Sequence, residues 1–80
     1  MKLDEIVEMI GKSVLGHETI EAKAKLCDYI TAINFMQKNY QYCTYDDDCK
    51  TFSCRLDNFI IMAHFDRDKL KISTHFTVKV

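Results

Sequence analysis

The side chains of this 80-residue chain that could carry out chemistry are four cysteines and three histidines. Cys43, Cys49 and Cys54 are separated by five and four residues, unlike the paired CxxC spacing of a zinc site, and no histidine lies three to five residues from another. We therefore expect no metal and no cofactor. In a reducing compartment, free thiols that act as small buried hydrophobic groups are the expectation.

A catalytic site is also not predicted. A cysteine nucleophile needs a histidine within hydrogen-bond reach, and spacing alone does not bring His64 or His75 to a thiol. The acidic run at residues 46–48 lacks the glycine and glutamate of an EF-hand loop, and neither glycine lies in a phosphate-binding turn. Because no nucleophile, base and oxyanion site are brought together, we do not expect an enzyme.

Composition fits one small globular domain over residues 1–80, with 48% hydrophobic residues and two glycines. A net charge of −1 argues against coating nucleic acid or an anionic membrane by bulk electrostatics. Asp4, Glu5 and Glu8 interrupt any signal peptide, and no apolar run approaches the ~18 residues of a membrane span. We predict a cytoplasmic protein that does not associate with membranes.

Two helices are predicted first, over residues 3–15 and 18–39. Leu3, Ile6, Val7, Ile10 and Val14 form one apolar stripe at helical spacing, and Gly16 is a natural stop. The longer second helix is predicted from a wider stripe. Its members are Ile20, Ala22, Ala24, Leu26, Cys27, Tyr29, Ile30, Ile33 and Met36.

After residue 39 the apolar period changes from 3.6 to 2, which predicts strands at 40–45, 51–56, 59–65 and 70–80. Their short polar connections require antiparallel pairing. A register with Asp46 opposite Thr51, Leu56 opposite Phe59 and Phe65 opposite Leu70 puts nearly all apolar residues on one face. It also places Cys43 opposite Cys54, so that a disulfide could form on oxidation.

The predicted fold is therefore α+β: two N-terminal helices followed by a four-stranded antiparallel meander, with the long helix packed on one sheet face. This arrangement is similar to helix-gripping rolls such as cystatins. The Gln-Val-Val-Ala-Gly signature of cystatins is missing from this chain, so the resemblance implies an architecture and no activity.

The other sheet face carries mostly polar residues, with Ile60 and Met62 as apolar exceptions on an inner strand. Scattered exposed apolar residues are normal. The functional alternative is a partner-binding or dimer patch in which Tyr42 and Met62 are adaptable anchors, bordered by Arg55 and His75.

The ends of the sheet differ in charge, because the first and third turns of a meander lie at the same end. The aspartates predicted to gather there are Asp46, Asp47, Asp48, Asp66 and Asp68. They either keep sheet edges apart or dock on a basic surface of another protein. The last segment, 70–80, is longer than its partner, so Val78 and Val80 could add to a second copy or a partner strand.

These features predict a small protein-binding module or stoichiometric inhibitor whose partner is a basic, nucleic-acid-handling protein. Residues with AT-rich codons greatly outnumber those with GC-rich codons, as in low-GC bacteria, many phages and some large DNA viruses. One concrete version is therefore a phage or mobile-element protein of the anti-CRISPR type that acts in the host cytoplasm. The alternative is a nucleic-acid-binding module that uses Arg55, Lys71, His75 and Lys79 with Tyr42 as a stacking platform. The net negative charge disfavours this alternative.

Overall fold

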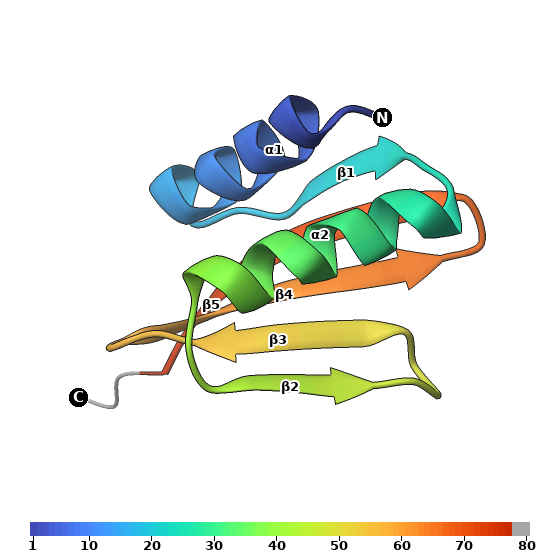
Figure 1. Ribbon diagram of the computed structural model, residues 1–80. Helices are drawn as coiled ribbons and strands as arrows, with labels where there is room; N and C mark the ends of the chain where they lie inside the picture. The colour runs from blue at the N-terminus through green and yellow to red at the C-terminus, as the bar shows by residue number, and fades with distance from the viewer. Residues whose placement is uncertain (78–80) are drawn as a thin grey trace.

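The computed structural model describes residues 1–77 of the chain. In chain order its elements are α1 (Leu3–Gly16), β1 (Ile20–Lys23), α2 (Leu26–Asn39), β2 (Cys43–Asp46), β3 (Thr51–Arg55), β4 (Phe59–Asp66) and β5 (Lys69–Phe76). The strands form one antiparallel sheet in the order β1-β5-β4-β3-β2, and both helices lie on the same side of it (Figure 1). The α+β class is confirmed, with five strands in place of the predicted four.

The first helix forms where the sequence predicts it. α1 buries Ile6, Met9 and Ile10 against the sheet. Gly16 is its last residue, and the following His17 adopts a left-handed conformation (φ 51°) from which its N–H donates to the Ser13 carbonyl. The helix therefore ends one residue later than predicted, through the backbone of His17.

The meander from β2 to β5 has the predicted register. Cys43 lies opposite Cys54, and Ala63 lies opposite Ile72. Because side chains alternate between the two faces of a strand, the helix side of the sheet collects the buried residues. They are Phe52, Cys54, Ile61, Ala63, Leu70 and Ile72. Tyr45 and Phe76, predicted for the same face, are exposed.

The prediction of one long helix over residues 18–39 is wrong in its first part. Ile20 and Ala22 are half-buried and alternate with exposed Glu21 and Lys23 as the edge strand β1. β1 pairs along β5, with Ile20 opposite Ile72. This pairing supplies hydrogen bonds to backbone groups along an edge of β5 that a four-stranded sheet would leave unpaired. Residues 20–23 therefore form a strand, although their apolar residues also have helical spacing.

The second helix begins only at Leu26, because Asp28 caps its start. The Asp28 carboxylate accepts a hydrogen bond of 2.8 Å from the backbone N–H of Lys25, as the third helical residue does in a capping box. The buried face of α2 is made by Asp28, Tyr29, Ala32 and Met36. Leu26, Cys27 and Ile30, predicted for the buried stripe, are exposed.

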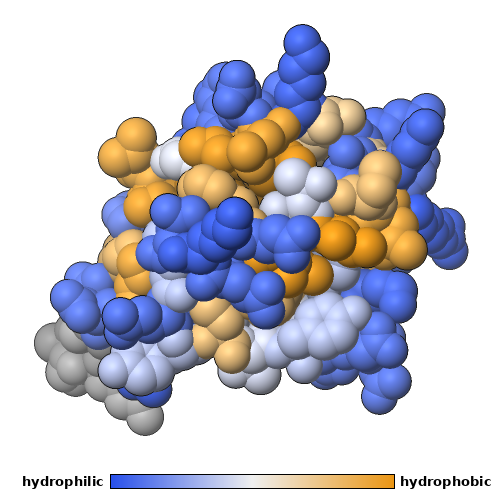
Figure 2. Space-filling model, viewed as in Figure 1, coloured by the Kyte–Doolittle hydropathy of each residue, from blue (hydrophilic) through white to orange (hydrophobic). Residues whose placement is uncertain are grey.

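Each helix covers a different part of the sheet. α1 packs on β1 and β5, whereas α2 packs on β3 and β4. The second helix therefore packs on one face of the sheet as predicted, but it shares that face with α1. Seen from this side, Figure 2 shows separate apolar areas with hydrophilic side chains between them. Leu3, Val7, Leu26 and Ile30 are exposed apolar residues of the two helices. Within residues 1–77, no helix has the length and apolar character needed to cross a membrane.

The strand predicted over residues 70–80 is an inner strand. β5 is paired on one side with β4 and on the other with β1, so residues 69–76 offer no free edge for a second copy. Thr77 follows β5, and its N–H donates to the Asn58 carbonyl (3.0 Å). Val78, Val80 and Lys79 lie outside the described residues.

Candidate functional site

The sheet has one side that faces away from both helices, which we call the outer sheet face. Strand alternation and register place on it Glu21, Lys23, Thr44, Asp46, Thr51, Ser53, Arg55, Ile60, Met62, His64, Asp66, Lys69, Lys71, Ser73 and His75. Within residues 1–77, the helices pack only on the opposite side. The outer sheet face is therefore a broad, mostly polar surface on a hydrogen-bonded scaffold.

Ile60 and Met62 are the apolar residues at the centre of this face, as predicted. Ile60 is flanked by Arg55 on β3 and His75 on β5. Met62 is flanked by Ser53 and Ser73 in the next row. Both apolar side chains are half-buried, so the strand register brings together four of the predicted partner-binding residues: Arg55, Ile60, Met62 and His75.

The two histidines of the outer sheet face are hydrogen-bonded to neighbouring hydroxyls. His64 Nδ1 lies 3.1 Å from Thr51 Oγ1, and His75 Nε2 lies 3.0 Å from Ser73 Oγ. A hydroxyl can donate to or accept from an imidazole, so each ring is held in place in either tautomer. Lys71 is likewise oriented, with Nζ 3.7 Å from Glu21 Oε1. These contacts orient the two imidazole rings and the Lys71 ammonium on the face.

Tyr42 lies away from its predicted place on a strand. It precedes β2, adopts a left-handed conformation (φ 55°) and is 77% exposed. Its carbonyl accepts a hydrogen bond from the Arg55 N–H (3.3 Å). A positive φ is uncommon for a bulky residue, and nothing in the sequence pattern of 40–45 signals it.

Tyr42 and Arg55 instead share an open groove of about 640 Å³ at the end of the sheet that holds the β3–β4 hairpin. The groove is lined by Asn39, Tyr40, Gln41, Tyr42, Arg55, Leu56, Asp57, Asn58 and Phe59. Its polar residues are three amides, two tyrosines, one arginine and one aspartate. The sequence does not predict this groove, because its lining comes from the end of α2, the residues that follow it and a distant hairpin.

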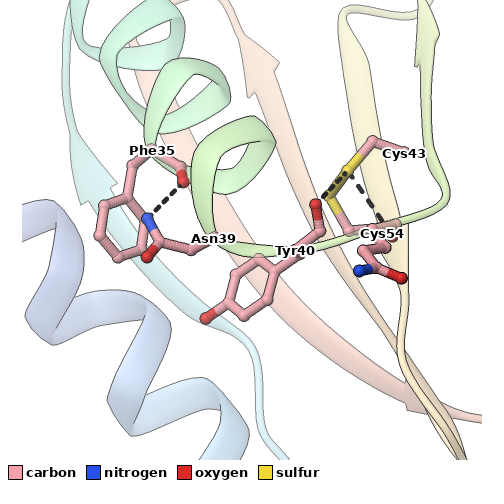
Figure 3. The surroundings of a disulfide bond; sticks show 6 residues. Phe35, Asn39, Tyr40, Cys43 and Cys54 are labelled. Carbon is pink, nitrogen blue, oxygen red and sulfur yellow. Dashed lines mark hydrogen bonds between the residues drawn. A yellow bond between two sulfur atoms is a disulfide. The ribbon is translucent and has the colours of Figure 1, made fainter.

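A disulfide between Cys43 and Cys54 ties β2 to β3 beside this groove (Figure 3). The two residues are directly opposite, with Cα atoms 4.1 Å apart. They occupy the close, non-hydrogen-bonded type of antiparallel pair, because the flanking Arg55 N–H bonds Tyr42. The expectation of four free thiols is therefore wrong for this pair, whereas Cys27 and Cys49 are free and exposed.

The acidic turns do lie at one end of the sheet, which we call the acidic pole (Asp46, Asp47, Asp48, Asp66 and Asp68). The Phe65 N–H next to the second turn donates to the Lys50 carbonyl of the first (3.0 Å). Within the first turn, Asp46 Oδ1 accepts the backbone N–H of Asp48 at 3.1 Å. Asp46 therefore has a structural role in shaping the turn.

Asp47 is also engaged within the turn. Its Oδ1 accepts the Tyr45 hydroxyl at 2.7 Å and lies 3.4 Å from Lys50 Nζ. Both contacts hold the pKa of the Asp47 carboxyl below its usual range, with the hydroxyl contributing more. The charge of Asp46 raises the pKa of the neighbouring Cys49 thiol, which lowers the thiolate fraction that could react.

The acidic pole is less acidic than the sequence predicts, because the end of β1 and the start of α2 bring Lys23 and Lys25 to it. The Ala24 N–H donates to the Asp68 carbonyl (2.7 Å), and Lys23 lies opposite Lys69. Lys23, Lys25 and Asp68 line one shallow depression. These lysines were predicted to lie within a helix, so their contribution to this end of the sheet was missed.

The described residues contain no group of three or more His, Cys, Asp or Glu side chains placed to hold a metal ion. The arrangement offers shape, hydrogen bonding and charge for binding, concentrated on the outer sheet face and the adjoining groove. Comparisons of the chain with protein-family models, curated proteins and solved structures found no match.

Proposed function

We propose that this protein is a small, non-enzymatic protein-binding module that captures a protein partner through its outer sheet face. The observation that carries the proposal is the uncovered side of a five-stranded sheet with Ile60 and Met62 half-buried at its centre. A partly apolar centre within a polar rim is typical of protein interfaces. Because the strands are mutually hydrogen-bonded, binding would order little of the backbone.

The acidic pole is a weaker candidate for the main contact. Asp46 and Asp47 make hydrogen bonds within their own turn, and Lys23 of β1 and Lys25 at the start of α2 line the same depression as Asp68. We propose that the pole steers a basic partner toward the module. The inhibitor version of the proposal, a phage or mobile-element protein of the anti-CRISPR type in a host cytoplasm, adds that this partner handles nucleic acid.

The alternative, a nucleic-acid-binding module on the same face, has less support. Arg55 and Lys71 lie on the outer sheet face, but Lys71 is 3.7 Å from Glu21. Tyr42, the predicted stacking platform, lies before β2 in the groove rather than on a strand. Neutralising phosphates by lysine and arginine would make binding fall steeply with salt.

The test is capture of a partner from a host lysate with Met62→Asp and a matched control. Met62→Asp puts a charge at the centre of the outer sheet face. Leu15→Asp puts the same charge on α1, at a leucine that is 86% exposed. We expect Met62→Asp to lose capture by at least about tenfold and Leu15→Asp to retain it. Circular dichroism of both variants checks that the fold is intact.

Two outcomes would contradict the proposal. Equal capture by folded Met62→Asp and by the wild type would exclude the outer sheet face as the binding surface. Binding of random oligonucleotides that weakens steeply with salt, together with no protein captured, would favour the nucleic-acid module.

The steering role of the acidic pole is tested with a double variant, Asp48→Asn with Asp66→Asn. These two side chains are chosen because they have no salt bridge within the described residues. We expect this double variant to associate with the partner protein more slowly than the wild type does.

A further inference from the structure

β1 is an edge strand whose outward backbone groups have no strand partner among the described residues. The Ala24 N–H donates to the carbonyl of Asp68, the residue directly before β5. Because backbone groups of alternate residues point to opposite sides of a strand, those of Ala22 and Ile20 also point toward β5. The N–H and C=O groups of Glu21 and Lys23 therefore point outward, along the free edge.

The side chains of the same two residues carry opposite charges on the outer sheet face. Lys23 lies directly opposite Lys69, an arrangement of like charges that destabilises a sheet. Among residues 1–77, no carboxylate lies within ion-pair distance of Lys23. Glu21 lies opposite Lys71, and its Oε1 is 3.7 Å from Lys71 Nζ. The free edge thus shows one exposed negative and one exposed positive group, two residues apart.

We propose that the protein forms a symmetric homodimer in which β1 pairs antiparallel with β1 of a second copy, centred on Ala22. In this register Glu21 of each copy lies opposite Lys23 of the other. The outward backbone groups of these residues then form four hydrogen bonds, two for each Glu21–Lys23 pair. The two sheets join into one continuous sheet of ten strands.

This register is selected by charge and by size. Shifting the centre to Glu21 or to Lys23 would place two like charges directly opposite each other across the symmetry axis, which is unfavourable. At the proposed centre, Ala22 meets Ala22 of the second copy in the close type of antiparallel pair, about 4.5 Å between Cα atoms. Two methyl groups fit there without displacing either strand.

The other free edge, β2, does not offer the same match. It leads directly into the acidic run Asp46–Asp47–Asp48. The outward residues of β2, Cys43 and Tyr45, carry no charge, so antiparallel pairing of β2 with itself would form no ion pair comparable to Glu21–Lys23. β1, and not β2, is therefore the edge whose charges match those of a second copy of the chain. The dimer leaves both outer sheet faces open, so it is independent of the proposed function.

The test measures the oligomeric state by sedimentation velocity from about 10 µM to about 1 mM, a range suited to a small interface. Glu21→Lys and Lys23→Glu each turn two attractive pairs into repulsive ones. We expect either change to raise the dissociation constant on the order of tenfold to a hundredfold. The double exchange, Glu21→Lys with Lys23→Glu, restores opposite charges at both positions and should restore the dimer.

Amide hydrogen exchange of the wild type supplies a second readout with an internal control. The Glu21 and Lys23 amides should be protected only at the high protein concentration. The Ala22 and Ala24 amides, which face β5 within one copy, should be protected at both. This arm decides the question if a charge variant fails to fold.

Three results would overturn the proposal. One is a wild type that stays monomeric at the highest concentration, which would mean that α1 or solvent shields the β1 edge. Another is a dimer that both single exchanges leave unchanged, which would place the contact between copies elsewhere. The last is exchange of the Glu21 and Lys23 amides that does not respond to concentration.

Discussion

Reducing the disulfide between Cys43 and Cys54 should destabilise the fold by about 3 kcal/mol. The two cysteines are 11 residues apart, so the bond closes a loop of about a dozen residues in the unfolded chain. The chain-entropy model gives about 3 kcal/mol for a loop of that length. A domain of this size has a free energy of unfolding on the order of 5–10 kcal/mol, so the bond accounts for a substantial part of it.

The assay is thermal unfolding followed by circular dichroism, with and without a thiol reductant. For a domain of 60–100 residues, each kcal/mol shifts the midpoint by about 4–8 °C, so reduction should lower it by roughly 10–25 °C. Two variants separate this bond from the other thiols. Cys27→Ser with Cys49→Ser removes both free cysteines and should keep the full response, whereas Cys43→Ala with Cys54→Ala should lose it.

The reasoning is refuted if the reductant moves the wild-type midpoint by less than about 2 °C, which corresponds to under about 0.5 kcal/mol. It is also refuted if Cys43→Ala with Cys54→Ala responds to the reductant as strongly as the wild type does. In either case the bond would not be constraining the unfolded chain, and β2 would have to be held on β3 by its backbone pairing alone.

Two further predictions concern buried polar groups of α2. Tyr29 is almost fully buried, and its hydroxyl has no hydrogen-bond partner within the described residues. Burial raises the pKa of this hydroxyl to about 12. Tyr29→Phe should therefore raise the free energy of unfolding by about 1 kcal/mol, and a loss of stability in denaturant melts would contradict this. The pKa of Asp28 is lowered, first by the Lys25 backbone N–H and also by the Met1 amino group 3.3 Å away. The ionised Asp28 carboxylate therefore stabilises the fold at a pH above its unfolded pKa of about 3.9, and this contribution is lost as the pH falls through the lower folded-state pKa. Asp28→Asn should lower the free energy of unfolding at pH 7, and this loss should shrink below about pH 4. An equal cost at pH 7 and at acidic pH, measured by denaturant titration, would be the contrary result.

The meander could be predicted from the sequence because two local signals agree. Short polar turns such as Asp57–Asn58 set each pairing, and alternation of apolar residues then allows one register only. That register places Ile60 beside His75 and Met62 beside Ser53, as the structure has them. The central part of the candidate surface followed directly from it.

β1 could not be predicted as securely, because the same residues satisfy two periods. Ile20, Ala24 and Cys27 fit a helical stripe, while Ile20–Glu21–Ala22–Lys23 fits an alternating strand. The choice depends on β5, about fifty residues further along the chain, whose edge needs a partner. The one local signal for a later helix start was Asp28, in place to cap α2 at Lys25.

The amide-lined groove and the mixed charge of the acidic pole were missed for related reasons. The groove depends on the left-handed backbone of Tyr42, which no turn residue in 40–45 announces. The lysines near Asp68 reach that end only because residues 20–23 form a strand. Both features arise where segments distant in the sequence meet, which neither composition nor periodicity reports.

The pairing of β1 with β5 also dictates an order of assembly. Ile20 lies near the start of the chain, and its strand partner Ile72 lies near the other end of the described residues. Contacts between such distant segments close a large loop, which slows folding compared with local contacts. During synthesis from the N-terminus, β1 must wait for β5 before its backbone is paired, whereas α1 can already pack on α2 and the β2–β4 hairpins can form from neighbouring residues alone. β1 is therefore the strand of the nascent chain whose backbone stays unpaired longest, and a chain shortened before β5 would leave it without a strand partner.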